Sequence, residues 1–469
     1  MKKAIIFFIV INFILSVKAQ SPTFEWAKVV GSSCLSLSVN NGKTLAIDTL
    51  GNTYSVGSFA GTVDFDPGSG IFNLTSATTN FDTFILKLDS VGNFVWAKNI
   101  GGAVSSDRVI GYSIALSKTG NLYVTGLFSG AIDFDPSSSG VTILSTAPTG
   151  QDIFVFKLDS LGDFVWAESM VGAGGASGYS IAIDSLENIY TTGYFSGTVD
   201  FDPGPGVTIY SSPIGTSKDM FILKLDSNGN FIWAKHIGSV GTSNCIACSI
   251  AIDKACNVYI TGFFQWTVDF NPGIGVFYLT AGAYNMFVVK FDSFGNFLWA
   301  DNIGDTGNIG GNSIIIDGLG NIYTTGCFVG GIDFDPGVGT FYMTSPVSQA
   351  AFISKLDSTG NFIWAKSLAG NLSTDNITGF SIIVDNNNNV YSTGEFNGKI
   401  DFDPGIGLFD LTASGSTDMF ISKLNTSGDF VWALDIGGWV AISSYARGSS
   451  IKIDKTNNLY TLGYFYGTV

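Results

Sequence analysis

A motif of the form Phe-x-Trp-Ala occurs seven times along this chain, at intervals of 65 to 70 residues. Its tryptophans are Trp26, Trp96, Trp166, Trp233, Trp299, Trp364 and Trp432. A repeat of this regularity is typical of a fold that grows by adding similar units, so the 469 residues are not divided into unrelated domains by length alone. The repeat limits the choice to a solenoid, a propeller or an array of small modules.

Within one repeat, the stretches "FILKLDSNGNFIWAKHIG" and "CSIAIDKACNVYITGFF" come close to alternating apolar and other residues. Such a period of two, broken by Asp-x-x-Gly-Asn clusters, predicts strands joined by hairpins. In the turn Asp226–Asn230 the aspartate carboxylate can accept backbone N–H groups. Gly229 can take a positive φ, as in a type I turn followed by a bulge.

Each repeat supplies four strands, followed by an excursion that carries Asp-Phe-Asp-Pro. One four-stranded sheet has too small a core to be stable alone, and radial stacking of several sheets solves that problem. The predicted fold is therefore an all-β β-propeller of about seven four-stranded antiparallel blades, with repeats of roughly 67 residues. We expect Trp233 to pack between neighbouring sheets, and Lys224 to snorkel or pair with a nearby aspartate. Tandem β-sandwiches remain an alternative, although such modules usually need about 100 residues each.

The number of strands of each type bears on the end of the chain. Three strand types occur seven times, but the Phe-Ile-Leu-Lys type occurs only six times, beginning at Phe84, Phe154, Phe221, Phe287, Phe352 and Phe420. Val469 aligns with Val63, and the missing strand would end near the equivalent of Ser90, 27 residues further on. We therefore expect an incomplete last blade and a C-terminally truncated chain.

The segment Met1–Gln20 has the features of a secretory signal peptide: two lysines, then an apolar run, then Val17-Lys18-Ala19. We expect cleavage after Ala19, which leaves residues 20–469 as the propeller. An uncleaved membrane anchor is the weaker alternative, because the apolar run is shorter than the ~20 residues that a span needs. No later segment is apolar enough to span. The predicted location is outside the cell or on the outer-membrane surface.

The formal net charge is −16, and the chain has only two arginines, Arg108 and Arg447. Nucleic acids and anionic membranes are bound by clustered basic residues, so neither is an expected partner. Divalent cations or neutral glycans suit such an acidic surface better.

The chain has five cysteines, Cys34, Cys245, Cys248, Cys256 and Cys327. Three of them lie near the only histidine, His236, which invites a zinc site. Against zinc, Cys256 stands where other repeats have a turn glycine, and Cys248 stands where others have tyrosine. One local disulfide with leftover thiols is the favoured interpretation.

The Asp-Phe-Asp-Pro excursion supports two hypotheses. Its two acidic side chains lie two residues apart on an extended segment, so both face one side, and calcium prefers such oxygen ligands. The candidate calcium ligands are Asp64, Asp66, Asp133, Asp135, Asp200, Asp202, Asp269, Asn271, Asp333, Asp335, Asp401 and Asp403. In the alternative, which we favour because every unit repeats the motif, the aspartates cap a tight Pro-Gly turn and the phenylalanine covers the sheet.

The stretches "GYSIAIDSLENIYTTGYF" and "DMFILKLDSNGNFIWAKHIG" resemble the bacterial β-propeller repeat family abbreviated SBBP. The resemblance covers Thr23 to Val469 and implies the propeller fold, but little about activity. The Asp-Phe-Asp-Pro excursion departs from the family's shorter repeat and resembles secreted Bacteroidetes proteins, many of which use type IX secretion.

The sequence contains no serine nucleophile elbow, phosphate-binding glycine loop or histidine-rich metal motif. His236 is expected on a strand surface rather than as a catalytic base, and we assign no catalytic or cofactor-binding residue. The favoured function is a secreted, monomeric, non-catalytic scaffold that binds a glycan or a protein. The alternative is a carbohydrate-active hydrolase or lyase, because carboxylate pairs formed between blades are not visible in sequence.

Overall fold

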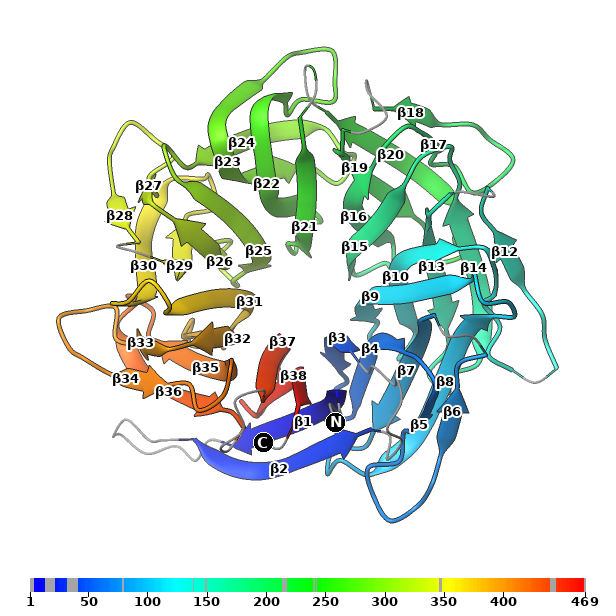
Figure 1. Cartoon of the computed structure of the whole chain (residues 1–469). Coiled ribbons are helices and arrows are strands. Elements are labelled where there is room, and N and C mark those ends of the chain that lie inside the picture. Colours follow the sequence, from blue (N-terminus) through cyan, green and yellow to red (C-terminus); the bar gives the residue numbers. More distant parts are fainter. Residues whose placement is uncertain are drawn as a thin grey trace. The chain divides into compact units, whose positions relative to one another are not determined.

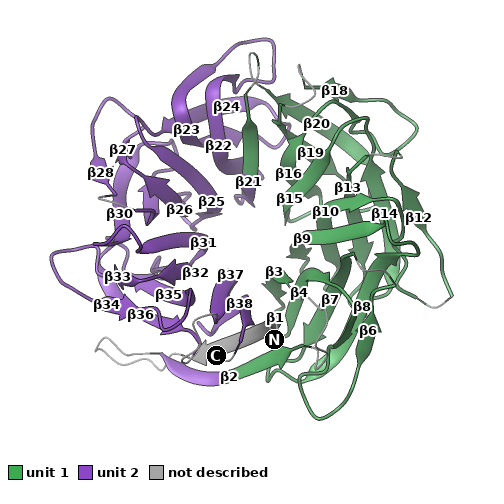
Figure 2. Cartoon of the chain, in the orientation of Figure 1, with its two compact units in different colours: residues 1–8, 26–247 green, residues 9–25, 248–469 purple. Residues whose placement is uncertain are grey.

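The computed structural model describes residues 4–12 (without their side chains), 22–31, 41–77, 80–137, 139–147, 150–212, 217–238, 241, 243–345, 348–438 and 444–467. These residues form strands β1 to β38 and no helix. None of the described residues therefore forms a helix that could cross a membrane. The chain divides into two compact units (Figure 2): unit 1 holds residues 1–8 and 26–247, and unit 2 holds residues 9–25 and 248–469.

Unit 1 contains three blades, each with four antiparallel strands in chain order (Figure 1). Blade 1 consists of β3 (Asn41–Ile47), β4 (Thr53–Phe59), β7 (Asp82–Leu88) and β8 (Phe94–Gly102). Blade 2 consists of β9 (Arg108–Leu116), β10 (Leu122–Ser129), β13 (Asp152–Leu158) and β14 (Phe164–Met170). Blade 3 consists of β15 (Ala176–Ile183), β16 (Ile189–Phe195), β19 (Asp219–Leu225) and β20 (Phe231–Ile237).

Unit 2 repeats this arrangement. Blade 4 consists of β21 (Cys245–Ile252), which begins in unit 1, β22 (Val258–Asp269), β23 (Tyr278–Phe291) and β24 (Phe297–Ile303). Blade 5 consists of β25 (Asn308–Ile316), β26 (Ile322–Val329), β29 (Ala350–Leu356) and β30 (Phe362–Gly370). Blade 6 consists of β31 (Asn376–Val384), β32 (Val390–Asn397), β35 (Asp418–Leu424) and β36 (Phe430–Ile436).

The last sheet contains β37 (Tyr445–Ile453) and β38 (Leu459–Tyr466) in the order β2-β1-β38-β37. The other two strands, β1 (Ala4–Asn12) and β2 (Thr23–Val30), are cut by the division between the units. β1 falls inside the predicted signal peptide, and no observation tests the cleavage after Ala19, so that assignment stays a prediction.

The Asp-Phe-Asp-Pro excursion forms a two-stranded hairpin between the second and third strands of a blade. These hairpins are β5 (Thr62–Asp64) with β6 (Asn73–Thr75), β11 (Ala131–Asp133) with β12 (Ile143–Ser145), β17 (Thr198–Asp200) with β18 (Ile209–Ser211), β27 (Gly331–Asp333) with β28 (Tyr342–Thr344) and β33 (Lys399–Asp401) with β34 (Asp410–Thr412). In blade 4 the same hairpin continues β22 and β23 without a break.

The location of the hydrophobic core, between successive sheets, distinguishes a propeller from a series of β-sandwiches. One hydrophobic cluster joins blade 1 to blade 2 and contains Val56 and Val124, while a second joins blade 2 to blade 3 and contains Val155 and Leu223. Blade 2 is thus buried on both faces, whereas each sheet of a β-sandwich is buried on one. The β-propeller prediction is confirmed, and the sandwich alternative is wrong.

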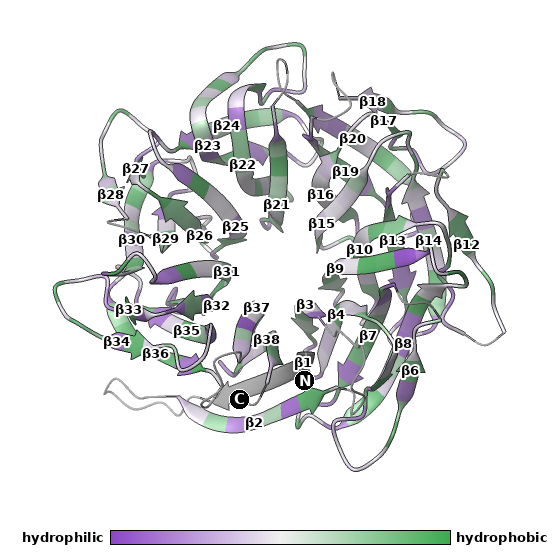
Figure 3. Cartoon of the chain, viewed as in Figure 1, coloured by the Kyte–Doolittle hydropathy of each residue, from purple (hydrophilic) through white to green (hydrophobic). Residues whose placement is uncertain are grey.

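Strict alternation of burial holds only at the edge of a blade. The fourth strand β8 exposes Val95 between the half-buried Phe94 and Trp96, but every residue of β4, β13 and β16 except Tyr194 is buried. In blade 2 the middle strand β13 has a strand on each side and a neighbouring blade on each face, so even its polar residues are enclosed. Hydrophobic and more hydrophilic residues still follow one another along strands such as β22 (Figure 3).

Candidate functional site

The first aspartate of each Asp-Phe-Asp-Pro hairpin caps backbone N–H groups at two places. Asp64 Oδ1 accepts hydrogen bonds from the N–H of Asp66 (3.0 Å) and of Phe72 (2.8 Å). The second residue then accepts the N–H at the turn, as Asp66 Oδ1 does from Gly68 at 2.7 Å. Backbone donors that would otherwise be unpaired are satisfied in this way.

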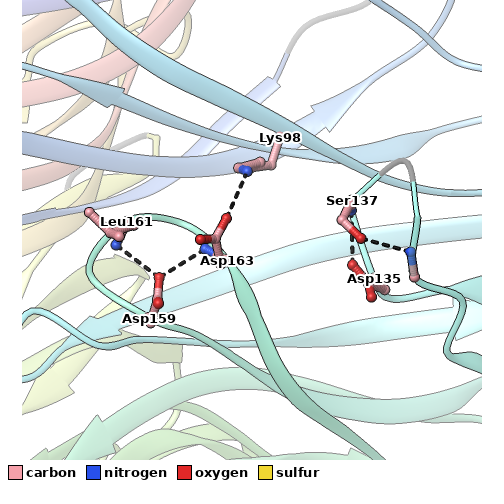
Figure 4. Close-up of polar contacts among 7 residues, drawn as sticks. Lys98, Asp135, Ser137, Asp159, Leu161 and Asp163 are labelled. Atoms are coloured by element: carbon pink, nitrogen blue, oxygen red, sulfur yellow. Dashed lines mark hydrogen bonds and ion pairs between the residues drawn. The ribbon is translucent and has the colours of Figure 1, made fainter.

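The same contacts recur in all six hairpins. The first-position caps are made by Asp64, Asp133, Asp200, Asp269, Asp333 and Asp401, and the second-position caps by Asp66, Asp135, Asp202, Asn271, Asp335 and Asp403. In Figure 4 Asp135 and Ser137 are drawn in one such turn. Asn271 fits because a side-chain oxygen is the only requirement of the turn. These contacts support the turn-capping hypothesis, while calcium binding stays a prediction. The described residues contain no group of three or more His, Cys, Asp or Glu that could hold a metal ion.

The phenylalanine of each motif fills the opposite side of the hairpin. Phe65 is fully buried and meets Phe59 edge-to-face at 5.4 Å between ring centroids. Equivalent pairs are Phe128–Phe134, Phe195–Phe201, Phe264–Phe270, Phe328–Phe334 and Phe396–Phe402. Edge-to-face pairs of buried rings stabilise a core by more than their buried area alone.

The hairpins also join one blade to the blade before it. β11 of blade 2 pairs with β8 of blade 1 through Ile132 and Gly102, and β33 of blade 6 pairs with β30 of blade 5 through Ile400 and Gly370. The excursion that lengthens the repeat therefore covers the exposed edge of the preceding fourth strand.

The repeated tryptophan and lysine make a second contact between blades. Trp166 Nε1 and Lys157 Nζ of blade 2 both donate to the carbonyl oxygen of Ser227 in blade 3, at 3.2 and 3.0 Å. In unit 2, Lys290 donates to the Ser358 carbonyl and Trp364 to that of Thr426. Figure 4 shows a related ion pair, Lys98 with Asp163, at 3.7 Å. Trp166 and Trp364 thus contact the next blade, while the ring of Trp233 meets Tyr190 of its own blade at 6.1 Å and its predicted packing between sheets stays a prediction.

The lysine of each third strand lies over a tyrosine ring of its own blade. Lys224 Nζ is 4.7 Å from the centroid of Tyr190, a cation–π contact, and only 8% of the residue is exposed. The same pairing occurs for Lys87–Tyr54, Lys157–Tyr123, Lys290–Tyr259, Lys355–Tyr323 and Lys423–Tyr391. Sequence reasoning expected Lys224 to snorkel or to pair with a nearby aspartate, and it missed the tyrosine ring.

The turn between the first and second strands is held by one carboxylate. In blade 1, Asp48 Oδ1 accepts the N–H of Leu50 and of Asn52, both at 2.9 Å. Its Oδ2 accepts the side-chain amide of Asn52 (2.7 Å) and the hydroxyl of Tyr54 (3.2 Å). Asp184, Asp253, Asp317, Asp385 and Asp454 hold the same turn elsewhere.

Blade 2 is the exception, because Ser117 replaces the aspartate. Ser117 Oγ still accepts the N–H of Asn121. The missing carboxylate comes from Glu187 of blade 3, which accepts hydrogen bonds from Thr119 (2.6 Å), Asn121 (3.1 Å) and Tyr123 (2.7 Å). Burial opposes the charge of Glu187, but these hydrogen bonds outweigh burial and lower its pKa to about 2.

A cavity of about 410 Å³ lies between the first turns of blades 1 and 2. Asp48, Tyr54 and Lys87 line it from blade 1, and Lys118 and Gly120 from blade 2. Gly120 holds the turn position that Glu187 holds in blade 3. Gly120 has no side chain, so this position of blade 2 offers no carboxylate to Tyr54, and the cavity lies where the counterpart of Glu187 would be expected by analogy with blade 3.

His236 lies on the fourth strand β20 and is partly buried. Its Nε2 is 2.8 Å from Oδ2 of the fully buried Asp219, and its ring lies 5.2 Å from Phe195 and 5.5 Å from Tyr210. Blade 1 has a comparable pair, Asn99 with Asp82, at the same place. The pair in blade 3 is therefore a variant of a structural contact.

Two carboxyl groups that sequence reasoning did not single out have strongly raised pKa values. Burial raises the pKa of Glu168 in unit 1 to about 7. In unit 2, burial and the nearby Asp357 raise the pKa of Asp301 to about 7. Such groups can act as acids or bases, so they are the residues to examine if the protein proves to be an enzyme.

A row of partly exposed side chains in unit 1 lies on the first strands β3, β9 and β15, on the second strand β16 and just before the third strand β19. The rings of Tyr112 and Tyr179 meet edge-to-face at 5.3 Å, and those of Tyr179 and Tyr194 at 5.4 Å. Lys43 Nζ lies 5.7 Å from the Tyr112 centroid, and Lys218 Nζ lies 4.3 Å from the Tyr194 centroid. These five residues are called the tyrosine strip below.

Unit 2 has a different cluster on its first and second strands. The Arg447 guanidinium lies 3.6 Å from the centroid of Phe380 and 3.9 Å from Glu395. Glu395 also accepts a hydrogen bond from Tyr445 at 2.6 Å. Arg447 is thus held by partners within the protein.

No disulfide joins the described cysteines Cys245, Cys248, Cys256 and Cys327. The local disulfide expected among Cys245, Cys248 and Cys256 is therefore absent, and Cys34 lies outside the described residues. Burial, with Cys327 nearby, raises the pKa of Cys248 to about 12. Cys256 occupies the turn-glycine position, with a φ of 62°.

Comparison with known proteins supports the fold more than the function. No family model matches the chain. The chain is similar to an uncharacterized WD repeat-containing protein, L264, of Acanthamoeba polyphaga mimivirus. The two are 24% identical over 436 residues, which cover 80% of this chain and 30% of that protein. The chain thus spans less than a third of its relative.

Among solved structures, the chain is similar to a protein of unknown function from Bacteroides caccae, with 10% identity and a TM-score of 0.34 over 75% of this chain and 90% of that one. A score this low carries no argument. The blades, the repeated turns and the WD-repeat relative together define a β-propeller scaffold, a class suited to interaction rather than to one fixed chemistry.

Proposed function

We propose that this protein is a secreted or cell-surface β-propeller that binds a protein partner and is not itself a catalyst. The observation that carries the proposal is the set of apolar side chains at the tips of the Asp-Phe-Asp-Pro hairpins. Ile274, Val338 and Ile406 are fully exposed there. Ile71, Val141 and Val207 are about three-quarters exposed at the corresponding tips.

These tips are held in place rather than loosely attached. The aspartate caps and the buried phenylalanine fix both sides of each hairpin, as described for Asp64, Asp66 and Phe65. Exposed apolar groups on a rigid support lose little conformational entropy on binding, and they are typical of protein interaction sites. The name of the mimivirus relative, a WD repeat-containing protein, agrees with an interaction role.

The test compares two sets of surface substitutions in the tagged full chain. Ile274→Ser, Val338→Ser and Ile406→Ser alter the tips. The control variants Leu50→Ser, Leu186→Ser and Leu319→Ser alter leucines of the first turns that are about three-quarters exposed. Proteins retained from the medium and envelope of the source cells are quantified by mass spectrometry. We expect a partner that the tip variants lose and the turn variants keep. Equal retention by both sets would refute the assignment to the tips.

The carbohydrate-active alternative is tested with the same purified protein. Incubation with a panel of polysaccharides is followed by assay of released reducing ends and unsaturated products. A non-catalytic scaffold releases neither. Product release that Glu168→Gln or Asp301→Asn abolishes would replace the scaffold proposal by a hydrolase or lyase.

A glycan is the second candidate ligand, and the tyrosine strip favours it. Sugar rings present C–H faces that pack on aromatic side chains, and tyrosine adds a hydroxyl group for hydrogen bonding. Tyr112, Tyr179 and Tyr194 supply three such rings in sequence across two blades.

A further inference from the structure

We propose that the tyrosine strip binds an anionic glycan, that is, a polysaccharide whose sugars carry carboxylate or sulfate groups. The inference rests on the glycan candidate above and names its chemical class. It concerns Lys43, Tyr112, Tyr179, Tyr194 and Lys218, all of which belong to unit 1.

The backbone places three of these residues at one equivalent point. In each first strand the pairing register shifts by one residue, and the residue left over is Lys43 in β3, Tyr112 in β9 and Tyr179 in β15. A β-bulge turns its extra side chain away from the regular alternation and is common next to functional sites. Three successive blades therefore bring three bulge residues into one row.

The bulge residue changes between blades while its neighbours stay nearly constant. A glycine precedes it and a serine or threonine follows it in Gly42–Thr44, Gly111–Ser113 and Gly178–Ser180. In unit 2 the same bulge carries Asn312 in β25, Phe380 in β31 and Ser449 in β37, and blade 4 has Cys248 at the equivalent sequence position. A requirement of the fold would explain the glycine before the bulge, but it would not explain why the bulge residues of unit 1 are lysine and tyrosine. Binding of a particular ligand by unit 1 would explain that choice.

The two lysines of the strip indicate that the ligand is negatively charged. Lys43 and Lys218 lie at the two ends of the row, each over a tyrosine ring. The acidic residues next to the strip in sequence are turned inward: Asp219 is fully buried against His236, and Asp107 is 3% exposed and accepts the N–H of Ala103 and Val104. On a chain of net charge −16, two lysines flanking three tyrosines form a local site for anions.

The ligand length is also constrained. An anion bound at Lys43 and another bound at Lys218 are separated by the three tyrosine rings, so one monosaccharide cannot reach both. The strip therefore fits a chain of sugars with repeated negative charges, and affinity is expected to rise from the monomer to the oligomer.

Two matched ligand pairs test the charge directly: oligogalacturonate against its methyl ester, and dextran sulfate against dextran. Binding to the purified full chain is measured by calorimetry at low and at physiological salt. We expect at least one charged member to bind about tenfold more tightly than its uncharged partner, with affinity that falls as salt rises. Equal binding within both pairs would refute the anionic class but leave a glycan ligand standing.

Substitutions locate the site. Lys43→Met with Lys218→Met, and separately Tyr179→Ala, are each expected to weaken binding of the charged ligand by about tenfold. Lys118→Met removes an exposed lysine from a first turn of the same unit and is expected to bind like the unsubstituted protein. If the double lysine variant, with an unchanged melting temperature, also binds like the unsubstituted protein, the strip is not the site. If no polymer binds, the glycan candidate fails with it, whereas the protein-binding proposal does not.

Discussion

In blades 1 and 2 the tyrosine beside the first turn donates its hydroxyl to a carboxylate, but the two carboxylates come from different parts of the chain. In blade 1 the carboxylate belongs to the turn itself, since Asp48 caps the backbone and accepts the hydroxyl of Tyr54. In blade 2 the turn has only Ser117, and Glu187 reaches across from blade 3 to accept the hydroxyl of Tyr123. Both tyrosine hydroxyls thus donate to a carboxylate, Tyr54 within its own blade and Tyr123 to the next blade.

The difference teaches that a repeat can lose a repeated residue when its neighbour supplies the same group. In sequence, Ser117 and Glu187 are two unrelated departures, 70 residues apart and in different repeats. In the structure they are one exchange, because successive first turns lie next to each other. The exchange also converts a local contact into one that couples two blades.

The largest effect is expected from Asp48→Ala. This change removes the acceptor of two backbone N–H groups and of the Asn52 and Tyr54 side chains. Gly120 stands where Glu187 stands in blade 3, so the described residues of blade 2 supply no second carboxylate to this turn. We expect the free energy of unfolding to fall by about 2–3 kcal/mol, measured by urea denaturation. Ser117→Ala, which removes a single backbone cap, should cost about 1 kcal/mol; an equal loss in both variants would contradict the comparison.

A smaller loss is expected from Glu187→Gly. Glycine relieves the positive φ of 62° at this position, but the acceptor for Thr119, Asn121 and Tyr123 is lost. For a partly exposed carboxylate we expect a net destabilisation of about 1 kcal/mol. The matched control is Asn388→Gly, at the same turn position in blade 6 with a φ of 59° and with Asp385 present. That control should stay within about 0.5 kcal/mol of the original stability.

Addition of Ser117→Asp to the Glu187→Gly variant completes this test. The double variant rebuilds the arrangement of blade 1 in blade 2, so most of the lost stability should return. Failure of the aspartate to restore stability would mean that Glu187 acts by some route other than its carboxylate.

The smallest effect is a pH dependence of the Glu187 contribution. The pKa of Glu187 is lowered from 4.5 to about 2 in the folded protein. A lowered carboxyl pKa adds stability that is fully present above pH 4.5 and is lost as the pH falls toward 2. The stability difference between the original protein and Glu187→Gln should therefore shrink over this range, as followed by urea denaturation at several pH values. A difference that stays constant from pH 6 to pH 3 would show that the charge is not involved.

The repeat itself made the fold predictable. Strand types, turn positions and the capping role of Asp64 and Asp66 follow from patterns that recur in every unit, so each copy supports the interpretation of the others. The burial of whole middle strands such as β13 was not predicted, because a period of two does not reveal that a sheet has neighbours on both faces. The contact of Lys224 with Tyr190 was missed for a similar reason. Its two residues belong to different strands of one blade.

The candidate sites could be predicted less well than the fold. The tyrosine strip depends on three β-bulges, and a shift of one residue in pairing leaves no mark in a single strand. The hairpin tips were visible as Pro-Gly turns, but the exposure of Ile274 and Val338 was not. The absence of a disulfide among Cys245, Cys248 and Cys256 was missed as well, since spacing along the chain does not show how the side chains lie in the fold.

The amino-acid sequence by itself determined the local structure of this protein: where strands end, which residues turn, and that one sheet design is repeated. These properties depend on contacts within a few residues, such as Asp48 with Leu50 and Asn52. Only the tertiary structure decided which residues of different blades meet, as Glu187 meets Tyr123 and Tyr112 meets Tyr179. The physical reason is that such contacts form only after separate sheets stack, and their geometry depends on bulges and register rather than on distance along the chain.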